Sequence, residues 1–121
     1  MEIEPFIKYW NNGNKKTEYW LLAGKYHRVG SPAFISYYAL GTIQEEYWYL
    51  NGDLHRADAP AIVYYSKSNK IKQEYWYIVD KKLKDEEVIV YKEWLIDNNL
   101  FSKDYNTWTD EEKILWKLRW L

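Results

Sequence analysis

The chain carries the triplet Glu-Tyr-Trp three times, beginning at Glu18, Glu46 and Glu74, so the interval is 28 residues on both occasions. A fixed period of this size is the signature of a repeat architecture, in which each unit buries its apolar surface against its neighbours. No other feature of the sequence restricts the fold as strongly. The period predicts a domain built from similar units set side by side.

The same register extends well outside the triplet. The runs 6–9, 34–37 and 62–65 align, as do the pairs His-Arg at 27–28 and 55–56 and the pairs Pro-Ala at 32–33 and 60–61. In the third copy, the segment 82–84 reads Lys-Leu-Lys where His-Arg is expected, and Pro-Ala is lost. We therefore expect a partial leading unit, two good repeats, a degenerate repeat and a different tail. Atypical end units are expected, because an end unit must cover the core instead of continuing it.

Each repeat contains two strand-like segments and two turn signals. The segment 46–50 is short and aromatic, which favours a strand, and Asn51-Gly52 after it is the strongest short hairpin signal. The segment 61–65 reads as the second strand, and the polar segment 66–70 turns into the next copy. Successive antiparallel hairpins of this kind predict one meandering sheet.

The tail from about Lys92 has a different periodicity. The segment 92–98 reads as a short helix, and Thr109 with Glu112 forms a capping box at the start of a second one. Spacings of three and four residues give the second helix an apolar face, made of Ile114, Leu115, Leu118 and Leu121. We expect this helix to cap the open end or one face of the sheet, since a bare sheet exposes its edges and apolar faces.

The predicted fold is a single, mainly β (α+β) domain over residues 1–121. An antiparallel meander of hairpin repeats occupies 1–91, and a helical C-terminal cap occupies 92–121. The chain has 8 Trp, 13 Tyr and 3 Phe. Each large ring buries about 150–250 Å², so a thin repeat sheet of this composition can be stable.

Charge, cysteine content and hydropathy exclude several classes of partner and location. The chain has 17 Lys and Arg against 18 Asp and Glu, so duplex nucleic acid is not an expected partner. The absence of Cys excludes disulfides and thiolate metal sites. No apolar run approaches the roughly 20 residues needed to cross a bilayer, and the N-terminus lacks the basic and apolar regions of a signal peptide. Neither membrane attachment nor secretion is therefore expected.

The segment 46–61 reads Glu-Tyr-Trp-Tyr-Leu-Asn-Gly-Asp-Leu-His-Arg-Ala-Asp-Ala-Pro-Ala. It resembles a repeat found in many phage and giant-virus proteins, in which an aromatic strand is followed by Asn-Gly, Leu-His-Arg and Pro-Ala. It also resembles a longer relative of the MORN-type hairpin repeat. The resemblance is good over 18–33 and weak over 74–90. It implies a hairpin sheet and a viral source, with the host cytoplasm as the place of action, but it implies little about activity.

Strand alternation indicates which aromatic residues are available for binding. The strands 6–9, 34–37 and 62–65 have one uniformly apolar side and one mixed side, and we expect the mixed side to be partly solvated. A tyrosine-rich strip is exposed if the ladder of Tyr19, Tyr47 and Tyr75 shares that side, and Tyr is favoured at interfaces. The alternative is that these rings only fill the core. The candidate partner-binding tyrosines are Tyr19, Tyr38, Tyr47, Tyr49 and Tyr64.

The recurring His-Arg pairs are the other candidate. His27, His55 and the nearby Asp58 are too few ligands for a zinc site, which needs three or four, so no metal is expected. Because the pair recurs at the structural period, it is expected to support the repeat. Arg28 and Arg56 can pair with the triplet glutamates or stack on a Trp ring. Anion binding by the two arginines is the alternative.

The residues do not point to catalysis. The serines lack a nucleophile-elbow pattern, and no glycine-rich phosphate loop is present. Neither an enzyme nor a cofactor is therefore expected. The leading hypothesis is a viral accessory protein that binds and inhibits a host protein, such as a component of antiviral defence, through an aromatic sheet face, with Arg28 and Arg56 as polar anchors. A nucleotide or small-anion sponge is the second hypothesis, and a structural repeat protein of the virion is the third.

Overall fold

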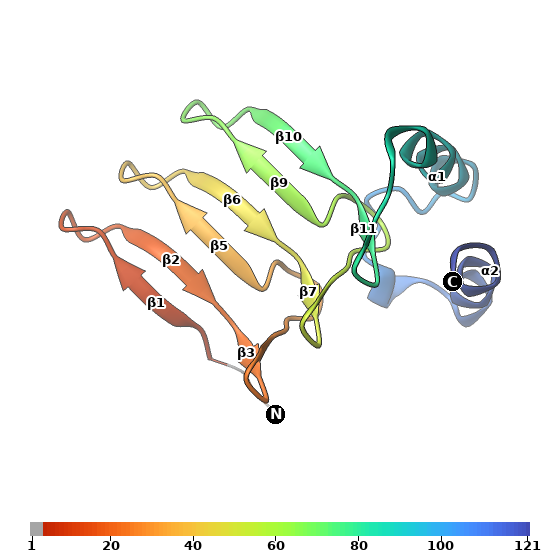
Figure 1. Ribbon diagram of the computed structural model, residues 1–121, viewed down its shortest axis with the longest axis horizontal. Helices are drawn as coiled ribbons and strands as arrows, with labels where there is room; N and C mark the ends of the chain where they lie inside the picture. The colour runs from red at the N-terminus through yellow and green to blue at the C-terminus, as the bar shows by residue number, and fades with distance from the viewer. Residues whose placement is uncertain (1–3) are drawn as a thin grey trace.

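The computed structural model describes residues 4–121, and its centre is a six-stranded antiparallel sheet in the order β1-β2-β5-β6-β9-β10 (Figure 1). Neighbours in the sheet follow each other in chain order and pair antiparallel, so the predicted meander is confirmed. Its strands are β1 (Phe6–Tyr9), β2 (Lys15–Tyr19), β5 (Phe34–Tyr37), β6 (Ile43–Tyr47), β9 (Ile62–Tyr65) and β10 (Ile71–Tyr75).

Each repeat also carries a small hairpin that leaves the main sheet. The segment predicted as one strand over 46–50 is interrupted at Trp48, whose N–H donates to the Ala61 carbonyl (2.7 Å) and whose carbonyl accepts from the His55 N–H (3.0 Å). The turn of this hairpin has positive φ at Asn51 (50°) and Gly52 (86°), as a two-residue turn of the primed type requires. The small hairpins are β3 (Leu21–Leu22) with β4 (Lys25–Tyr26), β7 (Tyr49–Leu50) with β8 (Asp53–Leu54), and β11 (Tyr77–Ile78) with β12 (Lys81–Lys82).

The register of the strands assigns side chains to the two faces of the sheet. Tyr47 lies opposite Phe34 on one neighbouring strand and opposite Ile62 on the other, while Glu46 lies opposite Val63. Because neighbouring residues of a strand point to opposite faces, the tyrosine ladder shares the mixed side, which the sequence had left open. We call this side the tyrosine face.

The C-terminal part is helical, and it begins earlier than predicted. Helix α1 spans Asp85–Asp97 and therefore starts ahead of Lys92. Its start is fixed by the Lys84 N–H, which donates to the Glu87 carboxylate (3.0 Å), and by acidic residues in the first turn. The β-branched run over 88–90 resembles a strand and conceals this start.

Two further helical elements complete the tail, η1 (Tyr105–Thr107) and α2 (Asp110–Trp120). The capping box predicted for α2 is present: the Glu112 N–H donates to Thr109 Oγ1 (3.1 Å), and the Thr109 N–H donates to the Glu112 carboxylate (2.8 Å).

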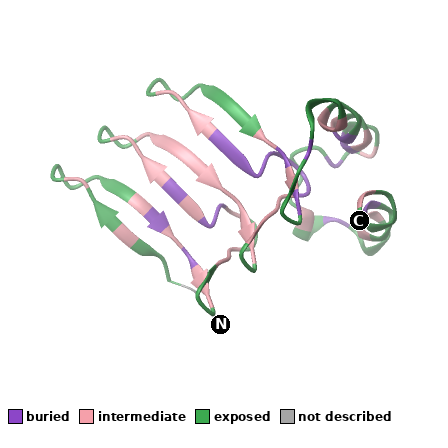
Figure 2. Ribbon diagram, viewed as in Figure 1, coloured by how far each residue is buried: buried purple, intermediate pink, exposed green. Residues whose placement is uncertain are grey.

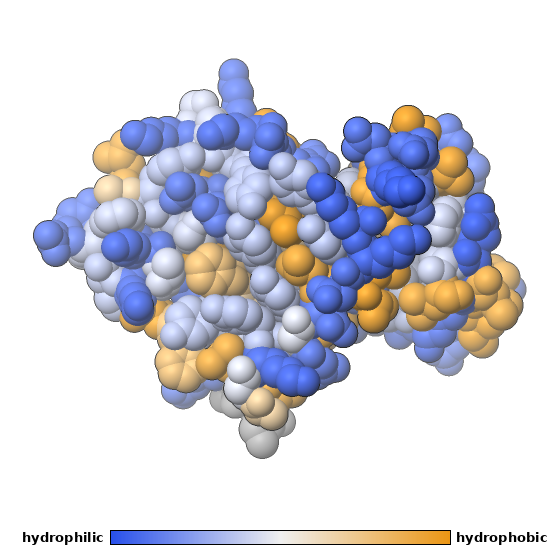
Figure 3. Space-filling model, viewed as in Figure 1, coloured by the Kyte–Doolittle hydropathy of each residue, from blue (hydrophilic) through white to orange (hydrophobic). Residues whose placement is uncertain are grey.

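The main core lies where the helices meet the third repeat, at the end of the sheet (Figure 2). Tyr91 and Leu95 of α1 are fully buried, and α2 contributes Trp116. Helix α2 therefore packs against the core through its aromatic residues. The aliphatic face of α2, which the spacing predicted to be buried, lies on the outside. Ile114 is 56% exposed and Leu118 is 78% exposed. Apolar side chains gather accordingly on the outer surface of the helical part, at the right of Figure 3.

Candidate functional site

A continuous strip of aromatic rings crosses the tyrosine face. Ring centroids of neighbours along the strip lie 5.1–6.4 Å apart, as for Tyr26 and Tyr49 (5.1 Å) or Tyr47 and Tyr49 (6.4 Å). These separations are those of stacked and edge-to-face aromatic pairs. The aromatic strip consists of Phe6, Tyr19, Tyr26, Phe34, Tyr47, Tyr49, Tyr64 and Tyr75.

Strand pairing explains how the strip is assembled. Phe6, Tyr19, Phe34 and Tyr47 occupy one cross-strand row, in which each lies directly opposite the next. The next residue of the row is Ile62, which has no aromatic ring. On the same strand, the ring of Tyr64 contacts both Tyr47 and Tyr75 and so continues the strip. The small hairpins then bring Tyr26 and Tyr49 against this row. The period of 28 residues thus becomes a spatial row of rings.

The rings of the strip remain accessible. Phe6 is 53% exposed, and all the other rings of the strip are partly exposed. Contiguous exposed aromatic surface on a folded domain marks an interaction site more often than isolated apolar residues do. The strip therefore has the accessibility that a docking surface needs.

Hydroxyl groups give the strip a polar component. The Tyr47 and Tyr64 hydroxyls form a hydrogen bond with each other (2.9 Å), and the Tyr75 hydroxyl donates to Gln73 Oε1 (2.9 Å). Partial burial raises the pKa of Tyr47, and the hydrogen bond to Tyr64 raises it further; burial also raises the pKa of Tyr49. The Tyr47 and Tyr49 hydroxyls therefore stay protonated at neutral pH.

Tyr38 lies beside the strip and is not part of its ring contacts. Its hydroxyl donates to the Tyr65 carbonyl (2.6 Å), which ties the turn after β5 to the next repeat. It lines a hollow of about 400 Å³ together with Tyr64 and Tyr75 of the strip. Four of the five tyrosines proposed from the sequence thus belong to the strip, and Tyr38 borders it.

Arg28 and Arg56 lie on the other side of the sheet. The Arg28 guanidinium carbon sits 3.6 Å from the centroid of the Trp20 ring, and that of Arg56 sits 3.7 Å from Trp48. Each arginine also donates to a backbone carbonyl four residues ahead, at 3.2 Å for Arg28 and 3.3 Å for Arg56. Of the two arrangements that the sequence allowed, pairing with the triplet glutamates or stacking on Trp, the structure shows the stacking. The arginines are not brought together with the tyrosines in one site.

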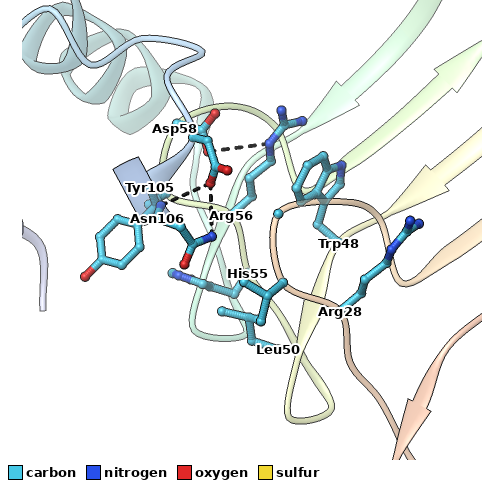
Figure 4. A pocket seen from close by; sticks show the side chains of 12 residues that line it. Arg28, Trp48, Leu50, His55, Arg56, Asp58, Tyr105 and Asn106 are labelled. Atoms are coloured by element: carbon cyan, nitrogen blue, oxygen red, sulfur yellow. Dashed lines mark hydrogen bonds and ion pairs between the residues drawn. The ribbon is translucent and has the colours of Figure 1, made fainter. Parts of the chain in front are cut away.

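A small cavity of about 130 Å³ lies between the two arginines and the tail (Figure 4). Figure 4 shows Trp48 between Arg28 and Arg56, with a dashed line that joins the Arg56 Nε to Asp58. The Arg56 Nε lies 3.7 Å from the Asp58 carboxylate, which is buried. Burial lowers the pKa of Arg56, which Asp58 partly offsets, and burial raises the pKa of Asp58. Since two carboxylates, those of Asp58 and Asp104, line the cavity together with the two arginines, it is poorly suited to an anion.

The histidines of the His-Arg pairs connect successive repeats. His27 Nδ1 accepts a hydrogen bond from the Asn51 N–H (2.9 Å), and His55 Nδ1 accepts one from the Val79 N–H (3.0 Å). In the third repeat no further unit follows, and Leu83 at this position is buried against the helices. Over residues 4–121, no three His, Asp or Glu side chains form a group that could hold a metal ion.

Sequence reasoning omitted several rings of the strip. Tyr75 follows Tyr47 by the repeat period, so the period alone would have found it. Phe6 and Phe34 lie on the mixed side of their strands, but only tyrosines were predicted as contact residues. Tyr26 has Leu54 at its position in the next repeat, so no periodic signal marked it.

No family model, curated protein or solved structure matches this chain. Within the described part of the chain, no helix has the length and apolar character needed to span a membrane.

Proposed function

We propose that the protein is a non-catalytic binding module that holds another protein on the aromatic strip. The observation that carries this proposal is the unbroken contact of partly exposed rings across the sheet. Tyr residues give a large contact area at low cost in side-chain entropy, because few torsions become fixed on binding. A row of rings that extends across several strands suits a protein surface better than a small molecule, which is usually held within a single concave pocket.

The resemblance to repeats of phage and giant-virus proteins extends this proposal to the kind of partner. In that setting the partner is a host protein in the host cytoplasm, such as a component of antiviral defence. Covering a functional surface of that protein is sufficient for inhibition, so the proposal requires no chemistry from this chain.

The nucleotide-sponge alternative has less support. It needs aromatic rings and guanidinium groups at one site, but Arg28 and Arg56 lie on the face opposite the strip. Both guanidinium groups are already stacked on Trp rings and bonded to backbone carbonyls.

The test is native mass spectrometry of tagged protein recovered from host lysate, followed by titration of the identified partner. We expect a bound mass of protein size with the wild type and its loss from Tyr47→Ala/Tyr49→Ala. Central aromatic residues of an interface contribute about 2 kcal/mol each or more, so the double substitution should weaken binding at least 100-fold, which corresponds to about 2.7 kcal/mol.

Tyr9→Ala is the matched control, because Tyr9 is 60% exposed and lies outside the strip. Near-ultraviolet circular dichroism would establish that each variant is folded. A folded double variant that binds as tightly as the wild type would exclude the strip as the site. An adduct of a few hundred daltons in place of a protein would favour the sponge.

A further inference from the structure

The two outer strands of the sheet are open, and the repeat makes them complementary. Over residues 4–121, no strand pairs with the outer side of β1 or of β10. β1 corresponds to β5 and β9 in the repeat, and β10 corresponds to β2 and β6. Inside the chain β2 pairs with β5, and β6 pairs with β9. The strand that would continue the sheet beyond β10 is therefore one with the sequence of β1.

The backbone hydrogen bonds at the internal junctions define how such a strand would pair. The Trp20 N–H donates to the Ala33 carbonyl (2.9 Å), and the Trp48 N–H donates to the Ala61 carbonyl (2.7 Å). Hydrogen-bonded pairs recur at every second residue of an antiparallel ladder, so Glu46 and Val63 form the next such pair.

One period further on, these positions are Trp76 and Glu74 at the β10 edge. On β1 the corresponding positions are Pro5 and Ile7. Pro5 keeps the carbonyl that the Trp76 N–H needs, and its missing N–H is not required there. Glu74 and Ile7 thus present outward backbone groups that match each other.

Side chains support the same register. Glu18 accepts a hydrogen bond from the Tyr37 hydroxyl (2.5 Å), and Glu46 accepts one from the Tyr65 hydroxyl. The next such pair would join Glu74 of one chain to Tyr9 of another. On the tyrosine face, the ring of Tyr75 would stack against Phe6 of the other chain, as the ring of Tyr19 stacks against Phe34 with their centroids 6.3 Å apart. The aromatic strip would continue across the junction.

Each edge strand carries one lysine, Lys8 in β1 and Lys72 in β10, and Pro5 precedes β1, but lysines of this kind do not prevent pairing in this sheet. Edge strands of natural proteins are commonly blocked by lysine, proline or inward charges. β10 reads Ile-Lys-Gln-Glu-Tyr, whereas β2, which is paired on both sides, reads Lys-Lys-Thr-Glu-Tyr. A strand richer in lysine is thus accommodated inside the sheet. Helix α1 does not close the edge completely, because a hollow of about 310 Å³ remains between α1 and the end of β10.

We propose that a second copy of this chain adds its β1 to the β10 edge, head to tail, with Ile7 opposite Glu74 and Lys8 opposite Gln73. The junction repeats the internal contacts between units, and it is a heterologous contact, so it can propagate into longer assemblies. A single pair of short strands makes a small interface, and such interfaces are weak or transient.

Sedimentation velocity on the full chain tests the proposal, over concentrations from about 10 μM to about 1 mM, the range of weak association. The wild type should show a mass that rises with concentration. Glu74→Pro and Ile7→Pro each remove one outward N–H, and proline is tolerated on an edge strand. Each proline variant should stay monomeric over the whole range. Glu74→Ala and Ile7→Ala are the matched controls that retain the N–H, and they should still associate.

Mixing the two proline variants separates this geometry from the alternatives. Each variant keeps one intact edge, so an equimolar mixture should form a dimer that grows no further. A wild type that stays monomeric at every concentration would overturn the proposal. Self-association by either proline variant alone would overturn it as well, because it would require pairing of identical edges or a different surface.

A second measurement covers the case in which a proline variant fails to fold. The chain has no Cys, so Lys8→Cys and Gln73→Cys proteins can be mixed and oxidised to trap the predicted pair. The control mixes Lys8→Cys with Glu45→Cys, because Glu45 is the equivalent of Gln73 inside the sheet, between β5 and β9. We expect at least tenfold more mixed disulfide with Gln73→Cys. Equal yields would contradict the head-to-tail register.

Discussion

Tyr91 joins the helical cap to the repeat sheet, and its hydroxyl is the most informative single group to remove. It donates to the Ala57 carbonyl in the second repeat and accepts from Trp116 Nε1 of α2 (2.7 Å). All three residues are buried, with Tyr91 0%, Ala57 2% and Trp116 2% exposed. Burial raises the pKa of Tyr91, and the bond from Trp116 partly offsets this effect, so the group is a neutral hydroxyl at neutral pH.

Tyr91→Phe leaves a buried N–H and a buried carbonyl without their partner. Each such group costs about 1–3 kcal/mol when it is orphaned, so the free energy of unfolding should fall by about 2–4 kcal/mol. A domain of this size is expected to have a total stability of about 5–15 kcal/mol, so the variant should lose a substantial part of it. The melting temperature should fall by about 10 °C, because 1 kcal/mol corresponds to about 4 °C at this chain length.

Guanidinium titration followed by Trp fluorescence and by far-ultraviolet circular dichroism measures this loss. Tyr105→Phe is the matched control. Tyr105 packs against Trp108 (4.8 Å) in the same core region, but its hydroxyl makes no side-chain hydrogen bond within residues 4–121. The control should change stability by less than about 0.5 kcal/mol. A loss below about 1 kcal/mol for Tyr91→Phe would refute the argument that the two bonds are buried and irreplaceable.

Three further predictions concern the repeat junctions. Arg56→Ala should cost about 3 kcal/mol, because it leaves the buried Asp58 unpaired. Arg28→Ala should cost less, about 1–2 kcal/mol, because it removes a stacked cation and one hydrogen bond but leaves no buried carboxylate unpaired. Thermal melts of the two variants give the comparison. Burial lowers the pKa of His55 in the folded chain, so the unfolded chain binds more protons at low pH. The free energy of unfolding should therefore fall as the pH drops below about 6.5. His55→Leu should show a smaller fall between pH 7 and 5, and an equal fall would exclude His55 as the source. Val79 has a φ of 44°, a left-handed backbone conformation that is strained for a β-branched residue. Val79→Asn should therefore stabilise the fold by about 1 kcal/mol. A lower melting temperature of this variant would contradict this account.

The repeat part of the fold was predictable from the sequence because one period reports on the same contacts several times. The Asn51-Gly52 turn, the shared face of the tyrosines and the stacking of Arg56 on a Trp ring each recur or have equivalents one unit away. The start of α1 at Asp85 was missed because its N-cap is Lys84, which is not a typical capping residue, and because a β-branched run follows it. A feature present once offers no second copy against which to check it.

The orientation of α2 was missed for a different reason. Ile114, Leu118 and Leu121 form a regular aliphatic pattern, but Trp116 and its neighbour Trp120, four residues apart, form a second apolar face. The deciding factor was the partner surface: Trp116 fits against Tyr91, Tyr105 and Trp108, and its indole N–H finds the Tyr91 hydroxyl. Periodicity on one helix does not reveal which of two apolar faces has a complementary neighbour.

The histidine bridges between hairpin turns make the length of this protein adjustable. At both internal junctions a histidine of one unit accepts from the turn of the next, and the array stops where Leu83 and α1 take over these positions. A duplicated copy of one unit would supply every contact that its neighbours require, since each unit touches mainly the adjacent ones. Gain or loss of whole units would then lengthen or shorten the aromatic strip in fixed steps while the same helical end piece is retained. A chain of this kind can change how much partner surface it spans without redesigning any single contact.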